Sequence, residues 1–241
     1  IDSDDLDRAF HIASGARATM SGVTVNDSSV TSANGGGVLN EGSLVFSHVT
    51  IQNSVLDNPS GIISQYGAGI YCAAGDITLT DVTVSGNMSA DPGVQTVFGG
   101  GIGISGDCTS DISRTIISGN SAASGGGMFI DTNTTTTNTL TDVEFTNNTA
   151  AVDAGGGLSG SGPEGNNPIV MNRVTFIENT AVAGGGVFAG TPMQITNGTF
   201  YNNTASDTGG GFNSSTGDTP EIVIAFSTFT NNHAGIAAGV Y

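Results

Sequence analysis

The sequence predicts an all-β fold, a right-handed single-stranded parallel β-helix (β-solenoid) of about eight coils with three short strands in each coil. Three observations predict this fold. A Gly-Gly-Gly-apolar motif recurs through the 241 residues, a segment of alternating apolar residues lies between successive glycine runs, and one position of the repeat is filled by Asn.

The glycine motif sets the period of the repeat. Ala sometimes replaces one Gly, an apolar residue always follows, and successive copies lie 25 to 32 residues apart. The third glycine of each copy falls at Gly37, Gly69, Gly101, Gly127, Gly157, Gly186, Gly211 and Gly239. A period of this length, without helical heptads, indicates coils that bury apolar residues only against their neighbours. Since no capping segment is evident, we expect one β-helix domain over residues 1–241 that is part of a longer chain or assembly.

Between the glycine runs, alternating apolar and polar residues predict strands. In the segment Leu79–Asn87, two polar residues separate Leu79 from Val82, so the period of two slips there. A corner between two short strands explains the slip. Each repeat therefore contains an apolar-x-apolar strand, a Val-x-apolar strand and the Gly-Gly-Gly-apolar strand.

An Asn residue closes the second strand in six consecutive coils. These residues are Asn87, Asn120, Asn148, Asn179, Asn203 and Asn232. Asn tolerates left-handed backbone conformations, and stacked carboxamides can hydrogen-bond from coil to coil. We predict a structural Asn ladder at this corner, in preference to a ligand-binding stripe.

Charged residues occupy the corner before the Val strand. Acid and base alternate over four coils as Asp81, Arg114, Asp142 and Arg173. Opposite charges on neighbouring strands stabilise their pairing by about 0.2–1 kcal/mol. We interpret this column as a charge ladder that controls register, rather than as a catalytic Arg–Asp cluster.

The two cysteines, Cys72 and Cys108, lie 36 residues apart, which is about one coil. Stacked coils would bring them within the range of a disulfide bond. Such a bond is expected in an oxidising compartment. Their spacing matches no metal site.

Two loops, residues 54–66 and 88–98, are longer than their counterparts and belong to consecutive coils. Either they fold back onto the rod, or they form a contact surface for a partner or a neighbouring copy. The second interpretation predicts an interface that contains Ile62, Ile63, Tyr66, Val94, Val97 and Phe98.

Composition narrows the choice of partners. The chain has 21 acidic residues, four arginines and no lysine, for a net charge of −17. This charge argues against a nucleic-acid partner, because phosphate contacts need clustered cations. No run of 18 apolar residues exists, so membrane insertion is not expected. Neither a resident metal nor an organic cofactor is predicted, although dedicated Ca²⁺ binding would also account for the acidity.

The glycine runs alternate with Phe-x-x-Asn segments at Phe145–Asn148, Phe200–Asn203 and Phe229–Asn232. These paired motifs resemble the polymorphic outer membrane protein repeat. The resemblance covers nearly the whole chain. It implies a right-handed parallel β-helix exposed at a cell surface, usually as an adhesive or passenger region.

Two functions remain open. The first is a non-enzymatic extracellular adhesin or structural element, which associates end to end or laterally into a filament or stalk, or binds a glycan or other surface ligand. The second is a carbohydrate-active enzyme, a polysaccharide lyase or glycoside hydrolase. A glycosidase needs two carboxylates about 5–10 Å apart, and Asp76 and Asp111, each just before a first-strand Ile, are the best candidates.

Overall fold

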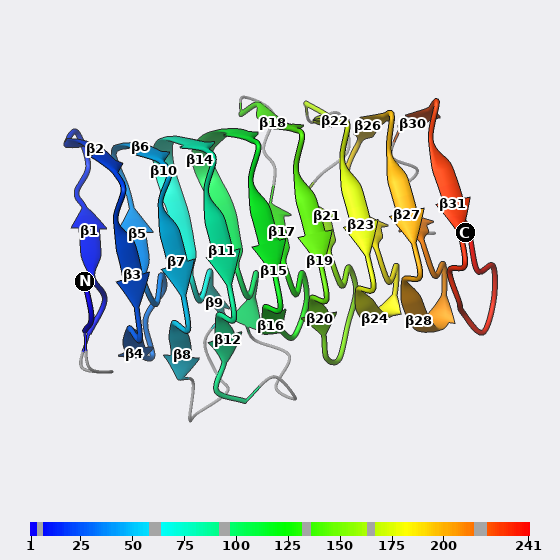
Figure 1. The fold of residues 1–241 in the computed structure, drawn as a ribbon, viewed down its shortest axis with the longest axis horizontal. Helices are drawn as coiled ribbons and strands as arrows, with labels where there is room; N and C mark the ends of the chain where they lie inside the picture. Colours follow the sequence, from blue (N-terminus) through cyan, green and yellow to red (C-terminus); the bar gives the residue numbers. More distant parts are fainter. Residues whose placement is uncertain (4–6, 58–63, 92–96, 132–135, 163–166, 215–220) are drawn as a thin grey trace.

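A computed structural model describes residues 1–3, 7–57, 64–91, 97–131, 136–162, 167–214 and 221–241. Throughout these residues the regular elements are β-strands that pair in parallel. They wind into a solenoid of about seven turns with three sheets around each coil. Figure 1 shows the coils side by side along one rod, with the two termini at opposite ends. The predicted fold class is confirmed.

Sheet A is the simplest of the three, with one short strand from each coil. Its strands, in spatial order, are β3 (Thr24–Asn26), β7 (Thr50–Gln52), β11 (Thr83–Ser85), β15 (Ile116–Ser118), β19 (Glu144–Thr146), β23 (Thr175–Ile177), β27 (Thr199–Tyr201) and β31 (Thr228–Thr230). These are the predicted Val-x-apolar strands.

Sheet B is the largest and has two halves, joined by β10 (Ile70–Thr80) and β14 (Ile102–Ser113), which run through both. The half that follows the glycine runs adds β1 (Phe10–Ile12), β5 (Val38–Asn40), β17 (Met128–Asp131), β21 (Leu158–Ser161), β25 (Val187–Ala189) and β29 (Phe212–Ser214). The other half adds β2 (Arg17–Ser21), β6 (Ser43–Ser47), β18 (Asn138–Thr141), β22 (Ile169–Asn172), β26 (Met193–Thr196) and β30 (Ile222–Ala225).

Sheet C lies after the Asn column, where the sequence predicts loop. Its strands are β4 (Ser29–Thr31), β8 (Val55–Asp57), β12 (Met88–Ser89), β16 (Ser121–Ala122), β20 (Thr149–Ala150), β24 (Thr180–Ala183) and β28 (Thr204–Thr208). A two-stranded sheet D pairs β9 (Gln65–Tyr66) with β13 (Val97–Phe98). The three predicted strands thus fall in sheets A and B only. The hydrophobic pattern does not indicate the strands of sheet C, because they are short and built mostly from Ser, Thr and Ala.

The Asn ladder is confirmed. The side chain of Asn148 is fully buried. Its Oδ1 accepts hydrogen bonds from the backbone N and the Nδ2 of Asn120, both at 3.0 Å. Its Nδ2 donates to the carbonyl of Ile117 at 2.9 Å and to Oδ1 of Asn179 at 3.0 Å. Every donor and acceptor of the carboxamide is used, and the same pattern runs from Asn87 to Asn232.

The glycine runs pack directly against this ladder. A Cβ atom on Gly101 would lie 2.6 Å from the carbonyl oxygen of Gly127 in the next coil and 3.0 Å from Nδ2 of Asn120. A side chain there would push both neighbours away. The Asn column and the glycine runs are therefore contact partners inside the rod.

The left-handed backbone lies one residue away from the ladder, so one of the two expected reasons for choosing Asn, its tolerance of that backbone, is wrong. The positive φ angles fall on the preceding residues, such as Asn147 and Glu178, with φ of 56° and 55°. Asn occupies the ladder for its hydrogen bonds alone. The charged corner is left-handed as well, with φ of 55° at Asp81 and 46° at Arg114.

Apolar side chains from sheets A and B fill the interior in stacked rows. In the C-terminal half, sheet A contributes four parallel phenyl rings with centroids 4.3 to 5.0 Å apart. The rings belong to Phe145, Phe176, Phe200 and Phe229. Each aromatic pair adds about 0.5–1.5 kcal/mol beyond the area that it buries. These are the phenylalanines of the repeat motif.

The charge ladder forms two separate ion pairs. Arg114 donates two hydrogen bonds to Asp81, at 2.8 and 3.0 Å, and Arg173 donates two to Asp142, at 2.6 and 2.8 Å. Hydrogen bonds from the guanidinium groups hold the pKa of both carboxyl groups below their ordinary value. Since the pairs are exposed, their contribution to stability is small.

The two cysteines form a disulfide bond whose Cα atoms are 5.9 Å apart. The half-cystines are not strand partners. Cys72 pairs with Ile104, Cys108 pairs with Gly75, and the register of the two strands shifts between Cys72 and Ala74. The disulfide therefore ties β10 to β14 at this irregularity.

Replacing Asn148 with Leu should lower the free energy of unfolding by about 1–3 kcal/mol, because the buried partners of the carboxamide lose their hydrogen bonds. Chemical denaturation measures this change. Thr146→Val is the control and should cost much less, because Thr146 faces outward from β19, two residues before Asn148. An equal cost for both variants would contradict a role for the ladder.

Replacing Asp142 with Arg places a third positive charge between Arg114 and Arg173. Stability should fall modestly in dilute buffer, and the loss should shrink as salt is added, because the exposed charges are screened. Thermal unfolding at low and high salt checks this. A loss that salt does not change would mean that steric strain, not repulsion, is responsible.

Candidate functional site

One column of side chains points outward from the glycine-run half of sheet B. Side chains alternate along a strand, so Tyr71 faces away from the core while Ile70 and Cys72 face it. We call the residues two positions after each third glycine the outer column. In strand register they are Leu39, Tyr71, Gly103, Phe129, Ser159, Phe188, Asn213 and Tyr241. From Tyr71 onward, an aromatic residue alternates with a small or polar one.

Sheet D fills the first gap in the outer column. A Cβ atom on Gly103 would lie 3.1 Å from Cβ of Tyr66, so glycine leaves the space that Tyr66 occupies. The ring of Tyr66 stacks at 5.4 Å on both Tyr71 and Phe98. The ring of Phe98 lies 4.9 Å from Phe129. A continuous aromatic cluster therefore covers this part of the face.

The predicted interface as a whole stays a prediction. Ile62, Ile63 and Val94 lie outside the described residues. The inclusion of Val97 is wrong, because it is fully buried in a small second core. Tyr66 and Phe98 are half-buried in the aromatic cluster. The described ends of the long loops thus fold back onto the rod.

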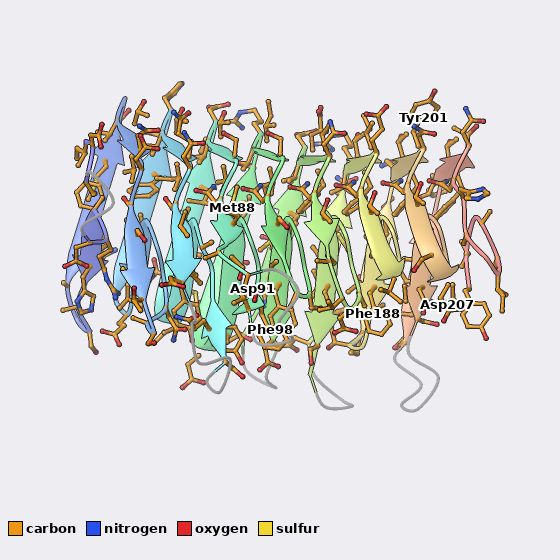
Figure 2. The ribbon with its side chains drawn as sticks, turned by 90° about the horizontal axis from the view of Figure 1, so that it is seen from below. Met88, Asp91, Phe98, Phe188, Tyr201 and Asp207 are labelled. Atoms are coloured by element: carbon orange, nitrogen blue, oxygen red, sulfur yellow. A yellow bond between two sulfur atoms is a disulfide. The ribbon has the colours of Figure 1, made fainter. Side chains whose placement is uncertain are left out.

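Two open cavities follow the aromatic cluster along the rod. The first, about 580 Å³, is lined by Phe98, Phe129 and Phe188 with Ser159. The second, about 320 Å³, is lined by Phe188, Asn213 and Tyr241. Because Phe188 belongs to both, the cavities form one interrupted groove. Figure 2 shows Phe98 and Phe188 along one side of the rod and Tyr201 on the opposite side.

The groove carries negative charge. Asp131 and Asp153 line the first cavity and Asp207 lines the second. Burial raises the pKa of the half-buried Asp131 carboxyl, which has neither a hydrogen bond nor an ion pair within the described residues. Burial, together with the Asp131 charge and Tyr71, also raises the pKa of Tyr66.

The arginines lie away from both cavities. Arg8 and Arg17 belong to the first coil, and Arg114 and Arg173 are engaged in the charge ladder. The chain contains no lysine. An anionic ligand would therefore meet repulsion in the groove.

Asp76 and Asp111, the acid pair expected from the sequence, do not occupy the same lateral position on neighbouring coils. In the strand register Asp76 lies opposite Thr109, whereas Asp111 lies opposite Thr78. Asp76 accepts a hydrogen bond from Ser43 at 2.8 Å, and Asp111 accepts one from Thr139 at 3.3 Å. The two acids are offset by two residues because the repeat lengths differ around the irregular β10–β14 pair.

Pattern reading missed the groove, although the sequence contains its signal. The outer column is visible once every repeat is aligned on its third glycine. The same alignment places Asp153 and Asp207 at one position, four residues before Gly157 and Gly211. Asp131 has no such signal, since only the structure reveals its burial.

The described residues contain no cluster of three His, Cys, Asp or Glu side chains that could hold a metal ion. They also contain no helix of the length and apolar character that crossing a bilayer requires. No protein-family model, curated protein or solved structure matches the chain. Function must therefore be argued from the groove itself.

Replacing Asp131 with Asn should raise the thermal midpoint at neutral pH. A carboxyl whose pKa is raised by folding opposes folding above that pKa, and this cost disappears as the pH falls below its ordinary value. The gain should therefore vanish in acid. Thermal unfolding at both pH values checks this, with the exposed Asp111→Asn as the control. A gain that persists in acid would mean that charge burial is not its cause.

Proposed function

We propose that the chain is a non-enzymatic extracellular β-helix protein that binds a linear polysaccharide along its groove, the activity of a cell-surface adhesin. The observation that carries the proposal is the outer column, which presents aromatic rings at regular intervals beside two cavities. Ligand sites commonly combine apolar walls with a few placed polar groups. Here the exposed polar groups are the carboxylates of Asp153 and Asp207, whereas Ser159 and Asn213 are buried in the cavity walls.

Sugars suit such a surface for a physical reason. The face of an aromatic ring carries negative potential, and one face of a pyranose ring presents weakly positive C–H bonds. The ring edges, in contrast, carry hydroxyl groups that need hydrogen-bond partners. A groove with aromatic rings along its length and carboxylates beside them meets both requirements. Its length along the rod favours a chain over a single sugar.

Two further features support an extracellular role. The disulfide between Cys72 and Cys108 is typical of oxidising compartments. The repeat also resembles the polymorphic outer membrane protein family, which is exposed at cell surfaces. A structural role with end-to-end or lateral self-association stays a prediction, as does binding of Ca²⁺.

Glycoside hydrolysis is the second candidate. Asp131 and Asp153 line the same cavity, and burial raises the pKa of Asp131. A carboxyl group of raised pKa that shares a cavity with a second carboxyl group is the arrangement that glycosidases use. Release of reducing ends from a polysaccharide, abolished by Asp131→Asn and by Asp153→Asn, would favour this function over binding alone.

Replacing Phe188 with Ser should weaken polysaccharide binding at least about tenfold, because Phe188 lines both cavities. Affinity electrophoresis through gels that contain soluble β-glucan or glycol chitosan measures retardation. Tyr201→Ser removes an exposed aromatic ring from the opposite side of the rod and is the matched control.

Retardation that is lost in the Phe188 variant and kept in the Tyr201 variant supports the groove. Equal loss in both variants, with unchanged thermal midpoints, would place binding elsewhere. Migration of the wild-type protein that no polysaccharide alters would overturn the proposed function.

A further inference from the structure

The groove repeats every second coil, although the fold itself repeats every coil. Coils that carry Phe129, Phe188 or Tyr241 in the outer column alternate with coils that carry Ser159 or Asn213. Parallel strands lie about 4.8 Å apart, so neighbouring aromatic residues are about 9.6 Å apart. This is close to the length of two pyranose units in an extended chain.

The two cavities have one set of groups in common, to which the first cavity adds Asp131 and Phe98. The first contains Phe129, Phe188, Ser159 and Asp153, and the second contains Phe188, Tyr241, Asn213 and Asp207. The two acids, Asp153 and Asp207, occupy the same position of the repeat, and each is exposed beside its cavity. The equivalent positions in the intervening and preceding coils hold Val182 and Ala123. The acids therefore follow the two-coil period of the aromatic rings.

In a β-1,4-linked polymer, successive sugars are turned over relative to one another. A given substituent consequently returns to the same side after every second sugar. A ligand with this period would present the same face to both aromatic-lined cavities and the same substituent to both acids. A repeating carboxylate selects a cationic substituent, and the amine of an amino sugar is the cation that polysaccharides carry.

We infer that each cavity holds one disaccharide of a β-1,4-linked amino-sugar polymer. The ammonium group of one sugar lies beside Asp153, and that of the second sugar along the chain lies beside Asp207. The inference rests on the proposed function, since it names the polysaccharide that the groove would bind. An ammonium group beside a carboxylate makes charge-assisted hydrogen bonds. The absence of cations in the described part of the groove leaves these acids available to the ligand.

Isothermal titration calorimetry with defined oligomers tests the inference. The probes are glucosamine oligomers of two to six units, N-acetylglucosamine oligomers, cello-oligosaccharides and tetralysine, at a pH where the amines are protonated. The glucosamine tetramer should bind roughly tenfold more tightly than its acetylated or neutral counterparts. Affinity should rise from dimer to tetramer, with little gain at the trimer.

The key variant is Asp153→Asn with Asp207→Asn. It should remove the preference, so that the variant binds the glucosamine tetramer no more tightly than the neutral oligomers. Asp76→Asn with Asp111→Asn removes the same charge from exposed positions outside both cavities and is the matched control. It should keep the preference, which separates local contacts from net charge.

The possible failures are distinguishable. If neutral oligomers bind as tightly as glucosamine oligomers, or the double variant keeps its preference, the inference is overturned while polysaccharide binding stands. If tetralysine binds as tightly as the glucosamine tetramer, charge alone is recognised and the inference also fails. If no oligomer binds, the inference and the proposed function fail together.

Discussion

The contact between the Asn ladder and the third glycines of the neighbouring runs, seen at Asn87, Asn120, Asn148 and Asn203, fixes the register on which the rest of the molecule depends. The carboxamide of Asn148 uses all of its hydrogen-bonding capacity on the coils beside it, and a Cβ atom on Gly127 would lie 3.0 Å from that group. A coil shifted by one residue would lose these bonds and turn its apolar side chains outward. Register at this corner therefore determines which residues align in all the remaining columns, including the outer column.

This constraint explains how much of the fold could be predicted. Residues that must repeat in each coil leave a periodic signal, so the Asn ladder and the Asp81–Arg114 pair are visible in the sequence. The strands of sheet C leave little signal, because a pair such as Ser121–Ala122 alternates too briefly to be recognised. The left-handed corner was also misplaced, since Asn147 and Asn148 are identical residues with different backbone roles.

The candidate site was harder to predict because it combines periodic and irregular parts. The outer column belongs to the repeat and can be aligned on the glycines. Tyr66 does not belong to the column, and it reaches Gly103 only because sheet D brings it over β14. Long insertions of unequal length break the alignment there. For the same reason, the burial of Val97 and Asp131 could not be recognised from their sequence positions.

The fold explains the gap at Gly103, which Tyr66 occupies, but the alternation in the outer column from Phe129 onward needs another explanation. The interactions that hold the coils together, namely the ladder, the glycine contacts and the stacked phenyl rings, recur in successive coils wherever they occur. A two-coil period is not needed for any of them. Phe188 is half-buried on the outer face, and its strand partner at the same position in the next coil is the polar residue Asn213. We propose that a ligand with the same repeat interval accounts for this period, which is found on the outer face and not among the contacts that hold the coils together.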